Sequence, residues 1–160
     1  MKYIKFSTGD VALDIISHIL LSNRVIGYAV PISQNLSCAW IFNIYFEGFD
    51  KTLSFSSKVT SSTGWKEYGY LRVDLNPIEC NKDVLKYTAI EPMNISSLDI
   101  LINEEDDVIS ECGLILRDRN NREIVISTAP APSAVSIRAD FNTLGYKPEI
   151  LFEQCRIKKI

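Results

Sequence analysis

Apolar and polar residues alternate with a period of two through most of this chain, and this pattern is the feature that most constrains its fold. The clearest case is the segment 37–47, where the alternation places Trp40, Phe42, Ile44 and Phe46 on one face and the intervening residues on the other. Side chains point alternately to the two faces of a β-strand, so this spacing predicts strands rather than helices.

Similar patterns recur along the chain and are joined by connections of hairpin length. Short loops of this kind join antiparallel strands, whereas parallel strands need long crossovers. The sequence therefore predicts an α+β fold, predominantly antiparallel β, arranged as a sandwich or partial barrel. The other predicted strands cover residues 3–6, 24–30, 52–60, 67–75, 84–90, 98–103, 110–117, 122–128, 134–139 and 151–157.

One segment near the N-terminus has helical spacing instead, and we expect a single helix packed on the sheet. Ser7 or Thr8 is the predicted cap, with Asp10 placed as in a capping box. The helix should end at Ser22 and Asn23. Its apolar face is predicted to comprise Ala12, Ile15, Ile16, Ile19 and Leu20.

Length and charge narrow the class of protein. The 160 residues fit a single domain covering 1–160, and a net charge of −3 argues against binding to nucleic acid. The first residues do not resemble a secretion signal, and the longest apolar stretch, near residues 15–21, is too short to span a membrane. We therefore expect a cytoplasmic protein that has no contact with a membrane.

The residues needed for common catalytic chemistries are scarce. The chain has one histidine, His18, so pairs of catalytic histidines and zinc sites with several histidine ligands are excluded. None of the seven glycines belongs to a phosphate-binding loop. We expect no catalytic residues, metal site or cofactor, and His18 should lie on the flank of the helix.

The four cysteines do not have the spacing of a metal or redox motif. Cys38, Cys80, Cys112 and Cys155 are each at least 32 residues apart in the sequence. We expect free and mostly buried thiols that act as small apolar side chains.

Two groups of residues could form a surface that binds a partner. The first is acidic and comprises Glu104, Glu105, Asp106, Asp107 and, just beyond them, Glu111. The second group combines aromatic and basic residues near a Ser/Thr/Gly loop, namely Trp65, Tyr68, Tyr70 and Arg72. Tyr68 and Tyr70 share one face of their strand, opposite to Leu71 and Val73, which should face the core. Two arrangements stay open for these tyrosines: they point outward into solvent, or they pack under the helix or a loop. Exposed aromatics beside arginine are typical of binding hot spots.

These features favour a small protein-binding protein, of the inhibitor or immunity type, rather than an enzyme. In size, acidity and lack of catalytic groups it resembles the immunity proteins that block a cognate toxin. The expected partner is a protein, such as a basic toxin or nuclease domain, whose substrate cleft the acidic surface would occupy.

Three alternatives remain open. The first is a β-barrel or sandwich module that binds a small ligand or sugar. The second is a hydrolase using two carboxylates, although Glu67 and Asp74 should face opposite sides of one strand. The third is a structural subunit that associates through exposed strand edges. The strand-borne acids considered for the hydrolase are Glu47, Glu67, Asp74, Asp99 and Glu111.

Overall fold

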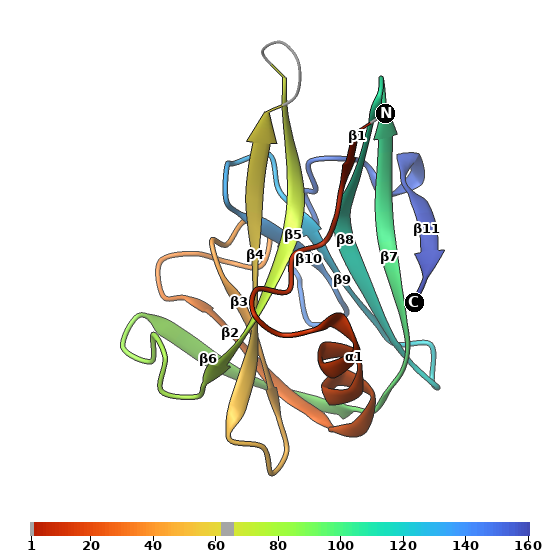
Figure 1. The fold of residues 1–160 in the computed structure, drawn as a ribbon. Coiled ribbons are helices and arrows are strands. Elements are labelled where there is room, and N and C mark those ends of the chain that lie inside the picture. The colour runs from red at the N-terminus through yellow and green to blue at the C-terminus, as the bar shows by residue number, and fades with distance from the viewer. Residues whose placement is uncertain (1, 62–65) are drawn as a thin grey trace.

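Two β-sheets packed face to face form most of the molecule (Figure 1). The computed structural model describes residues 2–61 and 66–160. Sheet I follows the order β10 (Val135–Arg138), β9 (Glu123–Thr128), β8 (Val108–Asp118), β7 (Ile95–Glu105) and β11 (Arg156–Lys159), with β1 (Lys2–Ile4) parallel to the start of β8. Sheet II follows the order β5 (Glu67–Pro77), β4 (Lys51–Ser61), β3 (Phe42–Phe46), β2 (Val25–Pro31) and β6 (Leu85–Met93). The predicted fold class is confirmed, since all the strand pairs except that of β1 are antiparallel within the described residues.

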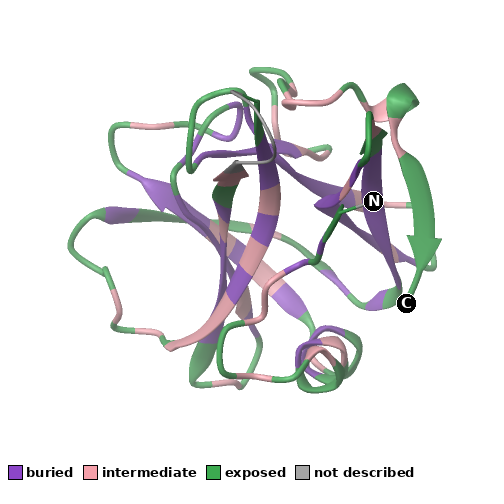
Figure 2. Cartoon of the chain, turned by 45° about the horizontal axis from the view of Figure 1, so that its top comes forward, coloured by how far each residue is buried: buried purple, intermediate pink, exposed green. Residues whose placement is uncertain are grey.

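The apolar faces of both sheets meet in one large core. Phe42 and Phe55 stand opposite each other on β3 and β4 and are both fully buried. Figure 2 shows the buried inner strands of both sheets, in contrast to the exposed edge strand β11. The helix α1 (Leu13–Ser22) lies at one end of the sheets and adds Ile16, Ile19 and Leu20 to this core.

Two isolated bridges tie the sheets together at their sides. Ser7 exchanges backbone hydrogen bonds with β5, through Leu71 O at 2.9 Å and Val73 N at 2.8 Å, directly after β1 has paired with sheet I. At another margin, Ala39 forms an antiparallel bridge to Val135 of β10, with backbone hydrogen bonds of 2.9 and 2.7 Å. These bridges give the sandwich the character of a partial barrel.

The helix begins later than the sequence predicted, and the predicted cap is wrong. Its N-cap is Ala12, which makes no side-chain capping bond. Ser7 is unavailable as a cap because its backbone bridges to β5. Ile15, predicted to face the core, is exposed, whereas His18 lies on the exposed flank as expected.

Strand boundaries differ from the prediction at the β6–β7 corner, where the chain changes sheet, and in the segment before β3. The prediction separated β6 from β7, yet Asn94 alone divides them. Pro92 is accommodated within β6 because this strand lies at the edge of sheet II, where a missing backbone donor is tolerated. Of the strand predicted at 37–47, only the part that forms β3 is a strand in the structure. Trp40 lies in a bend and is 43% exposed, whereas the prediction placed it facing the core.

The last twenty residues cover part of the outer face of sheet I. The strand predicted at 151–157 is replaced by a short 3₁₀ helix, η1 (Phe152–Gln154), followed by β11. Tyr146, Phe152 and Cys155 pack there against buried residues of β7, β8 and β9. This cover explains why β8 is buried on both faces over most of its length. Among the described residues, no helix is long and apolar enough to cross a bilayer.

Candidate functional site

The turn between β7 and β8 brings four acidic residues together at one end of the sandwich. Glu104 and Glu105 end β7, and Asp106 adopts a positive φ of 54° in the turn that leads into β8. Glu104, Asp106 and Asp107 are exposed, and Glu105 is half-buried. Figure 1 shows β1 and the start of β5 at the same end of the molecule. We call these four acids the acidic tip.

Cations on neighbouring segments partly neutralise the acidic tip. Lys66 is hydrogen-bonded to Glu105 and lies 3.9 Å from Asp106, and Arg156 lies 3.9 Å from Glu104. The Lys66 contact lowers the pKa of Glu105. The backbone of Lys2 also lies at the acidic tip, since its N–H donates a hydrogen bond to Asp107 O at 2.7 Å. Even with these three cations counted against four carboxylates, the acidic tip keeps an excess of negative charge.

The aromatic strand does lie beside the acidic tip, but its two tyrosines are buried or half-buried. Tyr68 is only 6% exposed and packs with Ile4 and Val108, so of the two arrangements left open by the sequence the packed one holds for this side chain. Tyr70 is half-buried against this group. Trp65 lies outside the described residues. The alternation did place Leu71 and Val73 in the core as expected.

Tyr3 is the exposed aromatic that the sequence did not single out. It lies on β1, opposite Ile109 of β8, and is 40% exposed. Its hydroxyl donates to Glu111 Oε2 at 2.7 Å, and Lys158 Nζ stands 5.8 Å from its ring centre. Only the parallel pairing of β1 with β8 brings Tyr3 to the acidic tip, and no local sequence pattern encodes that pairing.

Glu111 is not a surface acid, contrary to its predicted place in the partner-binding surface. Its side chain is 5% exposed. Its other carboxylate oxygen, Oε1, accepts a hydrogen bond from the backbone N–H of Phe6 at 2.8 Å, and Lys158 Nζ lies 3.6 Å from Oε2. Glu111 therefore fixes the N-terminal strand to β8 and is not available to a partner.

Arg72 is also engaged within the chain. Its guanidinium donates two hydrogen bonds of 2.9 Å to the Asp74 carboxylate, and this contact raises the pKa of Arg72. The side chain is half-buried near Gly9, beside the Ser7 bridge. The structure thus places Arg72 on the same strand as the tyrosines but pairs it with a neighbour.

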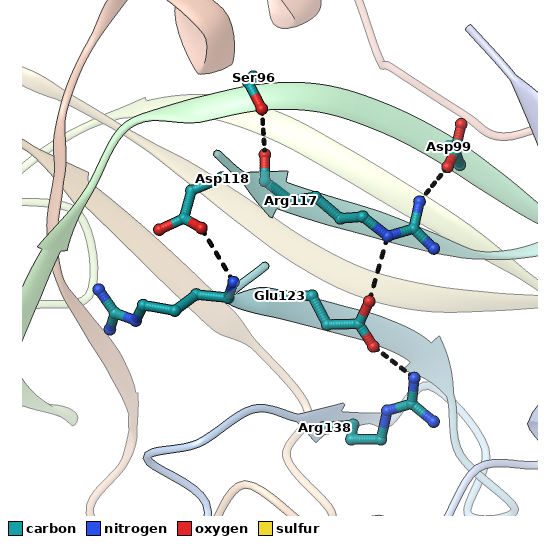
Figure 3. Close-up of polar contacts among 7 residues, drawn as sticks. Ser96, Asp99, Arg117, Asp118, Glu123 and Arg138 are labelled. Carbon is teal, nitrogen blue, oxygen red and sulfur yellow. Dashed lines mark hydrogen bonds and ion pairs between the residues drawn. The ribbon is translucent and has the colours of Figure 1, made fainter. Parts of the chain in front are cut away.

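Four of the five acids considered for a hydrolase, Glu47, Asp74, Asp99 and Glu111, lie in ion pairs, and the fifth, Glu67, is exposed. On the outer face of sheet I, Arg117 contacts both Asp99 and Glu123, and Glu123 also accepts from Arg138 at 2.5 Å (Figure 3). This ladder runs across the strands from β7 to β10. Glu47 and Asp74 likewise pair with Arg24 and Arg72. Carboxylates neutralised by arginine in this way are suited to holding strands together.

A separate cavity lies on the outer face of sheet II. It has a volume of about 310 Å³, and Tyr45 and Tyr87 form an edge-to-face pair in its wall with ring centres 5.1 Å apart. Tyr87 lies across Gly27, where a β-carbon would stand 2.3 Å from the tyrosine oxygen. The lining residues are Ile26, Ala29, Tyr45, Phe46, Ile78, Lys82, Leu85 and Tyr87.

Comparison of the chain with protein-family models, with curated proteins and with solved structures found no match. In the part of the chain that the structure describes, no three His, Cys, Asp or Glu side chains are grouped so that they could hold a metal ion. The arguments about function therefore rest on the surfaces described above.

Proposed function

We propose that this chain is a protein-binding protein of the inhibitor or immunity type, which docks on a basic partner through the acidic tip and Tyr3. The observation that carries the proposal is the excess of carboxylates at an exposed hairpin end beside an exposed aromatic ring. A toxin or nuclease domain with a basic substrate cleft is a partner of matching charge. The acids would attract such a cleft, and the tyrosine would supply contact area.

Two of the three ion pairs that the described residues form at the acidic tip, Lys66–Asp106 and Arg156–Glu104, are loose, which supports this proposal, whereas Lys66 is hydrogen-bonded to Glu105. Arg156 Nη2 and Glu104 Oε2 are 3.9 Å apart, and both side chains are about half exposed or more. Exposed pairs of this kind contribute about 0–1 kcal/mol, so a partner can replace them at little cost. Glu104 and Asp106 can therefore exchange their internal cations for those of another protein.

The first prediction concerns charge removal at the acidic tip. Replacing Glu104, Glu105, Asp106 and Asp107 by serine should lower the association rate with the partner about tenfold or more at low salt, and should flatten its salt dependence. The partner is first isolated on immobilised wild-type chain from the cells that make it. Rates are then measured for wild type and variant at two ionic strengths.

A matched control removes four exposed acids elsewhere. Serine at Glu47, Asp50, Glu79 and Asp83, which lie in loops of sheet II, changes the net charge by the same amount. This control should bind the partner nearly as fast as wild type. Equal rates for the tip variant and wild type would contradict the proposal, as would equal losses in the tip variant and the control.

A second candidate function, the binding of a small ligand, is favoured by the cavity on sheet II. Its volume falls within the range of about 300–1,000 Å³ that is typical of ligand pockets, and its walls are mostly apolar. Lys82 supplies a cation at its margin. The chemistry fits a compact apolar or aromatic molecule that carries a carboxylate.

A thermal-shift series tests this candidate. Small aromatic and aliphatic carboxylates should raise the Tm by about 5–10 °C at ~100 times Kd, because a ligand of the native state stabilises it. Lys82→Gln should weaken the response to carboxylates, whereas Lys86→Gln, a change outside this cavity, should leave it intact. No response to any carboxylate, or the same response in both variants, would remove the candidate.

A further inference from the structure

Two of the four cysteines lie in contact beneath the C-terminal segment. Cys112 in β8 and Cys155 between η1 and β11 are 43 residues apart in sequence, yet their Sγ atoms are 3.9 Å apart. Cys112 is buried as expected, but Cys155 and Cys80 are half-buried and Cys38 is exposed. All four thiols are free, as predicted, but only one of the four is buried, so the prediction that they are mostly buried is wrong.

We propose that Cys112 and Cys155 form an oxidisable dithiol site that reacts with low-molecular-weight disulfides, with Cys155 as the attacking thiol and Cys112 as the resolving thiol. The site is independent of the acidic tip and of the cavity on sheet II. Its two thiols differ in exposure, and that difference assigns their order of reaction. The half-buried Cys155 meets the oxidant first, while Cys112 at 3% exposure can reach only Cys155.

The surroundings of the two sulfurs support this order. The Cys112 hydrogen bond lowers the pKa of Cys155, whereas the same contact and burial raise the pKa of Cys112. Because the thiolate is the nucleophile, Cys155 is the more reactive of the two. Nearby Glu149 and Glu153 are negatively charged and oppose ionisation of Cys112 and Cys155, respectively.

The chemistry requires an oxidant, for which oxidised glutathione is the probe. The Cys155 thiolate attacks one glutathione sulfur, so a mixed disulfide forms, the glutathione disulfide breaks and one glutathione thiolate leaves. Cys112 then gives its proton to solvent and attacks Sγ of Cys155. The Cys112–Cys155 bond forms and the second glutathione thiolate leaves. The two cysteines are oxidised by two electrons in total, and the glutathione disulfide is reduced to two thiols.

Formation of the bond requires the two sulfurs to approach from 3.9 Å to about 2.05 Å. Cys155 lies outside regular secondary structure, and the β11 strand that follows is exposed along its whole length at the sheet edge. This part of the chain can move toward β8 more readily than the core strands can. The bond would attach the C-terminal segment covalently to β8.

Mapping of disulfides in the full chain tests the proposal. The reduced protein is treated with oxidised glutathione, its remaining thiols are alkylated, and it is digested without reductant for mass spectrometry. We expect a peptide joined through Cys112 and Cys155, with the free thiols falling from four to two. The oxidised chain should unfold about 5–10 °C above the reduced chain, since the crosslink closes a long loop.

Single variants test the order of reaction, and the other cysteines serve as internal references. Cys112→Ser should trap a glutathione adduct on Cys155, and Cys155→Ser should leave Cys112 unmodified; Cys112→Ala replaces the first variant if a buried serine prevents folding. Adducts on Cys38 or Cys80 without a Cys112–Cys155 crosslink would overturn the proposal. A glutathione adduct on Cys112 in Cys155→Ser that forms as fast as the adduct on Cys155 in Cys112→Ser would overturn the assigned order.

Discussion

Replacement of Phe42 by alanine is expected to lower the free energy of unfolding by about 3–5 kcal/mol. The Phe42 ring is fully buried between the sheets, with ring centres 5.8 Å from Tyr28 and 6.4 Å from Phe55. Tyr28 in turn stacks on Phe141, with ring centres 4.9 Å apart. Urea unfolding monitored by circular dichroism measures the change.

Trp40 provides the matched control for this substitution. The alternating pattern predicts Trp40 and Phe42 on the same face of one strand, but Trp40 lies in a bend and is 43% exposed. Trp40→Ala should therefore change the free energy of unfolding by only about 0.5 kcal/mol. Equal losses for the two variants would mean that residue 40 faces the core, as the alternation predicts, and would contradict the structure.

The same pair of residues shows how far the sequence could predict the fold. Alternation identified nearly all the strands, because a half-buried strand must keep apolar residues at every second position. It failed at the β6–β7 corner, where the chain leaves one sheet for the other, and at Trp40, which lies in a bend directly after Ala39 bridges to β10. Corners depend on the positions of both sheets, and local periodicity does not contain that information.

For the candidate site, the sequence located the acids in a turn but could not tell which of the nearby side chains are buried. Tyr68 is covered because β1 lies against β8 and brings Ile4 onto it. The contact between Tyr3 and Glu111 joins residues 108 positions apart. Contacts between residues so far apart in the sequence are determined by the tertiary fold. Alternation alone could therefore assign Tyr68 to one face of its strand but could not determine whether that face is buried.

Glu111 should stabilise the fold and should not contribute to binding of the partner. Glu111→Ala is expected to lower the free energy of unfolding by about 2–4 kcal/mol. The change removes the acceptor of the Tyr3 hydroxyl and of the buried Phe6 N–H. A buried donor left without a partner costs about 1–3 kcal/mol by itself. Lys158 is about half exposed, so water can solvate it and its loss of a partner adds little.

Glu104→Ala is the control, since Glu104 is exposed and pairs loosely with Arg156. Its effect on stability should stay below about 1 kcal/mol. The loss of stability caused by Glu111→Gln should lie between the losses caused by Glu111→Ala and Glu104→Ala, because an amide oxygen can still accept the hydrogen bond from the Phe6 N–H. If Glu111→Ala left stability unchanged while slowing partner association, Glu111 would belong to the acidic surface after all. Loss of stability with Glu111→Ala, together with slow association for the acidic-tip variant, would instead separate the residue that holds β1 in place from the residues that meet the partner.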